Sequence, residues 1–255
     1  MLGGRSFELV AREVTQPGNY KALVNMARRY PRFRENVARY FLGRGRYPYR
    51  CEVRTPRGIV APTLFSTDDM WTVNEIFCRE DYRAGPELRF VVDVGSNIGI
   101  SALYFLTRNA TSRVHLYEPV PANVAKLRDN LAGLEERYAL QEVAVADTAG
   151  PVSFGVEPTG RYGGIGVQTQ ETLTVDCLAI DDVLERALEE TDEIDVLKID
   201  TEGMEVRTVS AIRSDLLDRI GVIYFETDKR VDLFPDRFSS SYASMTVEMR
   251  RYSRA

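Results

Sequence analysis

Short apolar runs alternate with amphipathic stretches through the middle of the chain. The runs are rich in β-branched residues, which is typical of strands buried on both faces of a parallel sheet. They cover residues 89–94, 113–118, 138–145, 194–199 and 222–225. Between them, apolar residues recur at helical spacing, near residues 98–108, 121–133, 180–189 and up to about 213. Repeated strand–helix units predict an α/β fold, Rossmann-like, with a doubly wound, mostly parallel sheet and right-handed crossovers.

The first part of the chain follows a different pattern. Residues 1–48 carry apolar side chains at helical spacing, interrupted by Pro17-Gly18, and their last helix is expected over residues 33–42. A β-hairpin is predicted over residues 49–64, followed by a helix over residues 68–77 that Ser66 or Thr67 caps. The early helices are too short and polar to form a core of their own. We therefore expect them to act as a lid or as the contact of a homodimer.

These patterns divide the chain into a helical extension, residues 1–48, and a main domain, residues 49–255, whose core spans 89–228. Residues 147–178 interrupt the strand–helix rhythm with two strand-like pieces around a glycine-rich loop. After residue 228 the sequence predicts only one more strand, near residues 244–252. The sheet therefore has little room for further strands at its C-terminal side.

The composition is that of an ordinary globular protein, with 255 residues, 44% hydrophobic and 28% charged. A formal net charge of −5 argues against a nucleic-acid partner. Three widely spaced cysteines fit neither a disulfide framework nor a zinc site. The sequence shows no signal peptide and no apolar stretch of about 18 residues. We expect a cytoplasmic protein that does not bind a membrane.

A strand, a glycine-bearing turn and a helix follow one another at residues 89–106. This arrangement points the N–H groups of a helix toward the carboxyl edge of the sheet, where a ligand can bind. Two glycines, Gly95 and Gly99, let a ligand approach the backbone closely. The spacing Asp-x-Gly-x-x-x-Gly differs from the dinucleotide pattern, and Asp93 would repel a pyrophosphate but suits an ammonium.

Glu118 closes the second predicted strand and is well placed to accept hydrogen bonds from both hydroxyls of a ribose. S-adenosylmethionine (SAM) has an amino-acid end and an unphosphorylated ribose, so it satisfies both Asp93 and Glu118. The pattern therefore favours SAM, with NAD and a purely structural turn as alternatives. Acidic residues follow several strands in this way: Asp93, Glu118, Asp200, Glu202, Glu226 and Asp228. Any one of them could be a helix cap, but six at one sheet edge indicate a site.

Four segments resemble the FkbM family of SAM-dependent methyltransferases: residues 93–99 (DVGSNIG), 117–119 (YEP), 196–205 (VLKIDTEGME) and 225–226 (FE). The similarity covers roughly residues 50–228, and the block from Lys198 to Glu205 is its most specific part. The resemblance implies the class I methyltransferase fold, SAM as cofactor and a small-molecule acceptor. It also implies O-methylation of a hydroxyl or a carboxylate, often in natural-product biosynthesis.

Each part of the cofactor has expected contacts under this resemblance. The methionine part would contact the end of the first strand and the turn after it, at Asp93, Gly95, Ser96, Asn97 and Gly99. The ribose would contact Glu118 and Pro119 after the second strand. The adenine would lie along Val143 and Ala144 at the end of the third. Asp200 and Glu202 would face the methyl group and the acceptor, with Asp200 also contacting the cofactor. The loop at Gly160-Arg161-Tyr162-Gly163-Gly164 either covers the acceptor or is a mobile surface hairpin.

An alcohol acceptor must also lose a proton. His115, the one histidine in the sequence, lies inside a predicted strand, so we expect it to be buried rather than catalytic. The candidate catalytic residues are Asp200, Glu202 and Glu226. Asp200, Glu202 and Asp228 could instead share a Mg²⁺ ion, since hard cations prefer carboxylate oxygens.

Two other functions stay open. One is an NAD-type oxidoreductase, which would need a third glycine and either a tyrosine–lysine pair or a histidine as its catalytic group. Tyr162 and Lys198 are not suitably spaced to form such a pair. The other is a catalytically inactive SAM-fold protein that only binds partners. Such a protein would typically have lost the motif acids, which this sequence keeps.

Overall fold

A computed structural model describes residues 17–156, 163–167, 171–201, 203–243 and 245–252. The chain divides into two compact units, residues 1–83 and 84–255, whereas the sequence pattern placed its boundary at residue 48. Among the described residues, none of the helices combines the length and the apolar character needed to cross a membrane.

The first unit combines two helices with short strands and a longer helical segment. α2 (Pro17–Arg29) and α3 (Phe33–Leu42) precede a hairpin that is interrupted midway into two pairs, β1 (Tyr49–Arg50) with β4 (Thr63–Leu64) and β2 (Val53–Thr55) with β3 (Gly58–Val60). α4 (Thr67–Val73) continues as the π-helix η1 (Asn74–Arg79). The hairpin and helix α3 are confirmed, whereas a helix expected before Pro17 lies outside the described residues.

Contacts within this unit join the helices to the later segments. The Ser66 hydroxyl accepts from the Asp69 N–H at the start of α4, which confirms Ser66 as the cap. Asn25 Nδ2 donates to the Cys78 carbonyl at 2.8 Å, and Arg29 pairs with Glu80 at 3.1 Å. The helices of the expected extension therefore share one compact unit with the hairpin and η1.

The second unit is built on a seven-stranded sheet in the order β14-β15-β13-β12-β5-β6-β7. Its parallel strands are β5 (Phe90–Val94), β6 (Arg113–Tyr117), β7 (Tyr138–Gln141), β12 (Ile194–Ile199) and β13 (Ile220–Glu226). The mostly parallel, doubly wound sheet predicted from the sequence is confirmed. β14 (Phe238–Ala243) and β15 (Thr246–Arg251) run antiparallel to their neighbours. The expectation of a single strand after residue 228 was wrong, because β14 and β15 both lie in this segment and are separated by only two residues.

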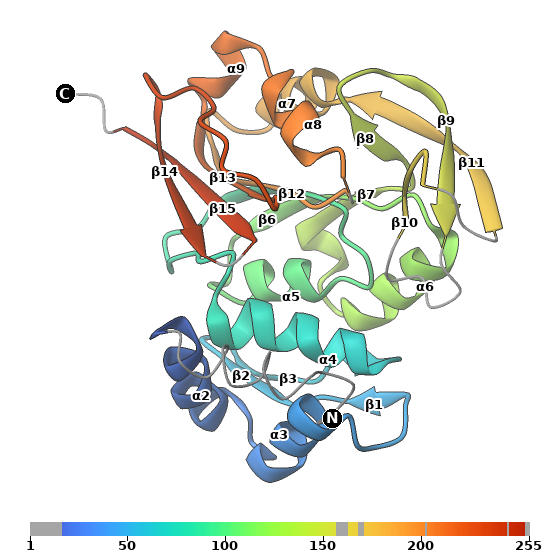
Figure 1. Cartoon of the computed structure of the whole chain (residues 1–255), viewed down its shortest axis with the longest axis vertical. Coiled ribbons are helices and arrows are strands. Elements are labelled where there is room, and N and C mark those ends of the chain that lie inside the picture. The colour runs from blue at the N-terminus through green and yellow to red at the C-terminus, as the bar shows by residue number, and fades with distance from the viewer. Residues whose placement is uncertain (1–16, 157–162, 168–170, 202, 244, 253–255) are drawn as a thin grey trace. The chain divides into compact units, whose positions relative to one another are not determined.

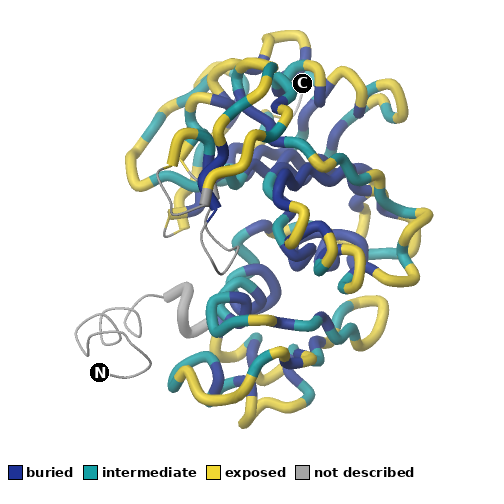
Figure 2. Tube along the Cα trace, turned by 90° about the vertical axis from the view of Figure 1, so that its right-hand side faces the viewer, coloured by how far each residue is buried: buried dark blue, intermediate teal, exposed yellow. Residues whose placement is uncertain are grey.

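Helices cover both faces of this sheet. Figure 1 shows α5 (Ile100–Leu106) and α6 (Pro121–Asn130) on one face, and α7 (Ile180–Leu188), α8 (Glu205–Ser210) and α9 (Ser214–Leu217) on the other. The helix expected up to about residue 213 is α8, which ends at Ser210, and the short helix α9 follows it. All five residues of β5 and all seven of α5 are buried (Figure 2). Because each fully buried aliphatic side chain contributes about 1.5–3 kcal/mol, the central strands give the strand ends a rigid base.

A second sheet of four strands, ordered β10-β9-β11-β8, lies beside the first. It contains β8 (Ala144–Ala146), β9 (Gly150–Val156), β10 (Gly163–Ile165) and β11 (Glu171–Ala179). The strand predicted over residues 138–145 was therefore wrong in extent: β7 ends at Gln141, and Ala144 begins a strand of the other sheet. The 3₁₀ turn η2 (Glu135–Arg137) leads into β7. Residues 160–162 of the glycine-rich loop lie outside the described residues.

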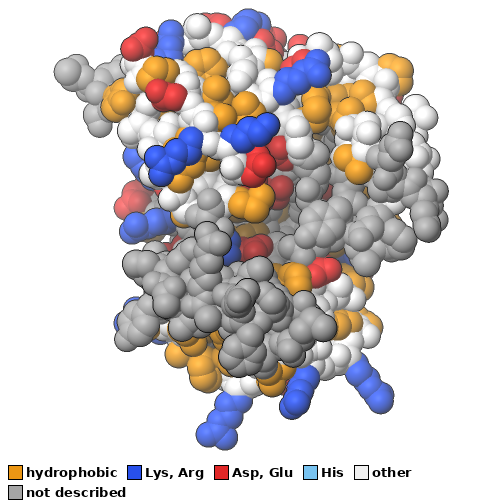
Figure 3. Space-filling view, in the orientation of Figure 1, with side chains coloured by type: hydrophobic (Ala, Val, Ile, Leu, Met, Phe, Trp, Pro, Cys, Tyr) orange, Lys and Arg blue, Asp and Glu red, His pale blue; other side chains and the backbone are white. Residues whose placement is uncertain are grey.

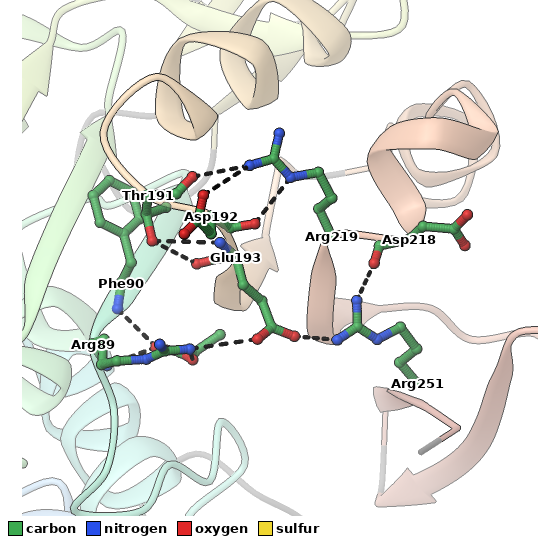
Figure 4. A network of polar contacts seen from close by, with 9 residues as sticks. Arg89, Phe90, Thr191, Asp192, Glu193, Asp218, Arg219 and Arg251 are labelled. Carbon is green, nitrogen blue, oxygen red and sulfur yellow. Dashed lines mark hydrogen bonds and ion pairs between the residues drawn. The ribbon is translucent and has the colours of Figure 1, made fainter. Parts of the chain in front are cut away.

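Charged side chains fasten the amino-terminal ends of the central strands (Figure 4). Asp195 Oδ2 accepts from the backbone N–H groups of Arg89 and Phe90, at 2.6 and 2.9 Å. The Arg89 guanidinium reaches Glu193, which also pairs with Arg251 of β15. Three strands are thereby joined at the edge opposite the carboxyl ends.

On the described part of the face drawn in Figure 3, charged side chains of both signs are interspersed.

Candidate functional site

The turn between β5 and α5 is tightly packed against β12. Gly95 has φ +76°, and a Cβ at this position would lie 1.9 Å from the Asp200 carbonyl oxygen, so only glycine fits. The N–H groups of Gly95 and Ser96 both donate to the Tyr117 carbonyl, at 2.9 and 3.1 Å. Asn97 has φ +47°, and Gly99 packs on Leu127 with φ +85°. The glycines marked by the sequence therefore allow three strand ends to converge.

Glu118 links this turn to the next one. Its Oε2 accepts from the Asn97 N–H at 2.9 Å, while its Oε1 accepts from the Val120 N–H at 3.0 Å and from Asn123 Nδ2 at 3.2 Å. The residue is 5% exposed, and this burial raises the pKa of its carboxyl although the hydrogen bonds oppose the change. Glu118 therefore shapes both turns, and its contact with a ribose stays a prediction.

Asp93 and Lys198 form a buried ion pair across β5 and β12. The two residues are direct neighbours in the sheet register, and Lys198 Nζ lies 3.0 Å from Asp93 Oδ1. Asp93 Oδ2 accepts from the Ser101 hydroxyl at 2.5 Å, and Asp93 has no exposed surface. The Ser96 hydroxyl donates to the Asp93 carbonyl at 2.8 Å. Asp93 thus stabilises the turn through its contacts with Ser96 and Ser101. Its expected contact with a cofactor stays a prediction.

The Lys198 ammonium has further partners at the strand ends. It donates to the Gly95 carbonyl at 2.7 Å, lies 3.4 Å from the Val94 carbonyl, and is 3.6 Å from Asp200 Oδ2. Burial lowers the pKa of Lys198, but the carboxylates of Asp93, Asp200 and Glu226 outweigh it and raise the pKa above its ordinary value. The side chain, 2% exposed, is therefore a fixed positive charge.

Asp200 is an acidic side chain that stays partly exposed at this edge. Its backbone N–H donates to the Val94 carbonyl at 3.1 Å, and its side chain is 34% exposed. The following loop is held by Glu205, whose carboxylate accepts from the N–H groups of Thr201 and Gly203. Glu202 lies outside the described residues, so its expected role next to Asp200 is not tested.

The remaining acids do not form a metal site in the described part of the chain. Glu226 is partly buried at the end of β13, and Asp228 is exposed two residues later. Within the described residues, no three His, Cys, Asp or Glu side chains lie together as ligands of one ion. The hypothesis that Asp200, Glu202 and Asp228 share a Mg²⁺ ion is therefore supported by the sequence alone.

The residues expected along the adenine lie near a small apolar cluster. Pro119 is buried directly after Glu118, and Ala144 packs with Val120 and Phe154 of the second sheet. Val143 contacts the main core instead. The second sheet therefore adjoins the turn that contains Glu118, while adenine binding itself is untested.

His115 and the cysteines are structural. His115 is 4% exposed in β6, its Nε2 lies 3.1 Å from Glu190, and burial lowers its pKa. The expectation that it is buried is confirmed. Cys51, Cys78 and Cys177 are free and buried. Burial raises the pKa of the Cys51 and Cys78 thiols to about 12, which makes them poor nucleophiles.

The known proteins to which this chain is similar in sequence are methyltransferases. Residues 93–254 match the family model of the methyltransferase FkbM domain. The hexuronic acid methyltransferase AglP of Haloferax volcanii is 23% identical over 75% of this chain and 80% of its own length. The 31-O-demethyl-FK506 methyltransferase FkbM of Streptomyces tacrolimicus is 33% identical, over 38% of this chain and 39% of its own.

A solved structure of a methyltransferase FkbM from Methylobacillus flagellatus KT is similar to this chain with a TM-score of 0.46 and 15% identity. The similarity covers 72% of this chain and about half, 54%, of that one. Because the family model matches well over half of the chain, the protein belongs to the FkbM methyltransferase family.

Proposed function

We propose that this protein is a SAM-dependent O-methyltransferase that acts on a small molecule. The observation that carries the proposal is the convergence of three groups at one sheet edge: the Gly95 turn, the buried carboxylate of Glu118 and the open carboxylate of Asp200. An uncharged turn lets the ligand approach, and carboxylates suit the hydroxyls and the ammonium of SAM. The bound cofactor would supply an activated methyl group.

The acceptor is an oxygen nucleophile in this proposal. Two relatives named above act on a hexuronic acid and on a 31-O-demethyl precursor, which supports a hydroxyl or carboxylate of a small molecule. Transfer is an in-line displacement, so the rigid strand ends would contribute by positioning. A hydroxyl acceptor also needs a proton acceptor, for which Asp200 and Glu226 are the described candidates.

The experiment uses SAM labelled in its methyl group and two acceptor panels, one of hexuronic acids and one of polyhydroxylated natural products. Mild alkali then separates the products, because methyl esters hydrolyse and methyl ethers do not. Label in either fraction, with one S-adenosylhomocysteine (SAH) formed per methyl, is the expected result. Failure of the wild-type protein to bind SAM or SAH in calorimetry contradicts the proposal, whatever acceptor is supplied.

A further inference from the structure

One ammonium faces more than one carboxylate at the centre of the site. Lys198 Nζ lies 3.0 Å from Asp93 and 3.6 Å from Asp200. The two nearer carboxylates, Asp93 and Asp200, outnumber this one ammonium. Because Asp93 is buried against Lys198 and Asp200 is 34% exposed, a cationic ligand group can reach Asp200 and form a charge-assisted hydrogen bond with it.

The two nearer carboxylates differ in access. Asp93 has no exposed surface, and both its oxygens face internal partners, Lys198 and Ser101. Asp200 is 34% exposed and lies at the strand end beside Gly95. An incoming cation can therefore reach Asp200 but not Asp93.

Lys198 also controls the backbone of the turn. Its ammonium donates a hydrogen bond to the Gly95 carbonyl at 2.7 Å. In the chain, this carbonyl directly precedes the N–H groups of residues 96–99. Because the Lys198 side chain is buried and comes from the rigid strand β12, it fixes this carbonyl and the Asp200 carboxylate relative to each other.

We propose that Lys198 is a positioning residue: with Asp93 as its anchor, it holds the Gly95 turn and Asp200 so that Asp200 receives the ammonium of the methionine end of SAM. This inference rests on the proposed function. It leaves Glu226 as the described candidate for accepting a proton, since a carboxylate that binds cations is a poor base.

Two nucleosides distinguish a positioning role of Lys198 from a general structural role. SAH carries the amino-acid end that Asp200 would bind, and 5′-methylthioadenosine lacks it. Calorimetry compares the wild type with Lys198→Met, the charge-neutral double variant Asp93→Asn/Lys198→Met, and Asp200→Asn. Lys229→Met, an exposed lysine given the same substitution, is the control. Lys198→Met leaves the buried carboxylate of Asp93 without its counter-charge. If this variant does not fold, the double variant, which removes both charges, is measured in its place. Asp200→Asn changes only a partly exposed side chain.

The double variant and Asp200→Asn should each bind SAH about tenfold or more weakly than wild type and bind 5′-methylthioadenosine within about threefold. SAH affinity near that of wild type in either variant overturns the inference, because Lys198 then only neutralises Asp93 or Asp200 is not the receiving group. Equal weakening for both nucleosides in the double variant also overturns it, since Lys198 is then merely structural. A wild type that binds neither nucleoside overturns the proposed function, and this inference with it.

Discussion

The backbone N–H of Asn97 donates to Oε2 of Glu118 across 2.9 Å, although the two residues belong to different strand–helix turns. The other oxygen of Glu118 is engaged by Val120 and Asn123. The carboxylate therefore joins the two turns that the cofactor is expected to contact, and any change in it alters both.

Glu118→Gln should weaken SAH binding by about tenfold or more, because hydrogen bonds to a charged group contribute about 1.5–3 kcal/mol. Both oxygens accept from N–H donors, so either orientation of the amide sets an NH₂ group against a donor. Calorimetry measures the affinity, and Glu136→Gln, an exposed residue, is the matched control. Unchanged affinity in Glu118→Gln would remove Glu118 from the site.

Gly95→Ala should destabilise the fold more than Gly133→Ala. Both glycines have positive φ, which costs an alanine about 1–2 kcal/mol. A Cβ at Gly133 meets open space, whereas at Gly95 it collides with the Asp200 carbonyl. Urea unfolding gives the two free energies. Equal losses would show that the turn and β12 are not in close contact.

Asp195→Ala should lower stability by about 1–3 kcal/mol, because the N–H groups of Arg89 and Phe90 and the Arg89 guanidinium lose a charged acceptor. The residue lies at the amino-terminal edge of the sheet, so SAH affinity should stay within about twofold of wild type. Thermal unfolding and calorimetry test the two parts separately. Asp192→Ala, which removes a fully exposed carboxylate, should change stability by less than about 0.5 kcal/mol.

The Lys198 ion pair should make stability depend on alkaline pH. Burial lowers the pKa of Lys198, but its carboxylate neighbours raise it above the ordinary 10.5. A raised folded-state pKa contributes stability that is present below 10.5 and is lost as pH rises through the folded value. The free energy of unfolding of wild type minus that of Asp93→Asn/Lys198→Met should therefore fall above this pH. A constant difference would contradict the pairing.

Glu226→Gln should reduce turnover of a hydroxyl acceptor by about 10²–10⁴-fold if this carboxylate accepts the proton. SAH affinity should change little, because the methionine end is assigned to Asp200. Turnover is measured with an acceptor found in the labelling screen, and Asp236→Asn, an exposed acid, is the control. Turnover within about threefold of wild type would leave positioning as the main contribution.

The central strands of the main sheet, β5, β12 and β13, were largely predictable because most of their residues are apolar. β12 has the bounds expected from residues 194–199. β14 was missed because three of its six residues are serines and its face is mostly exposed, so the run lacks the apolar signal of a central strand. The break after Gln141 follows from a change of sheet partner, which local sequence does not encode.

The sequence predicted that Gly95, Glu118 and Asp200 lie at one edge of the sheet, but it did not predict the ammonium of Lys198 between the strand ends. Lys198 lies between the apolar residues Leu197 and Ile199, and its counter-charge Asp93 is 105 positions away in the sequence. The two meet only because β5 and β12 pair in one register. A lysine at a position buried by apolar neighbours on both sides was the available signal. It indicates that a carboxylate must lie on an adjacent strand.

The position of β15 between β13 and β14 has a consequence for synthesis on the ribosome. β14 emerges before the strand that connects it to the sheet, and the outer edge of β13 has no partner until residues 246–251 follow. The nascent chain therefore exposes an unpaired, apolar strand edge until its last strand arrives. Such an edge is a template for pairing between chains, so we expect ribosome stalling before Thr246 to favour aggregation over completion of the sheet.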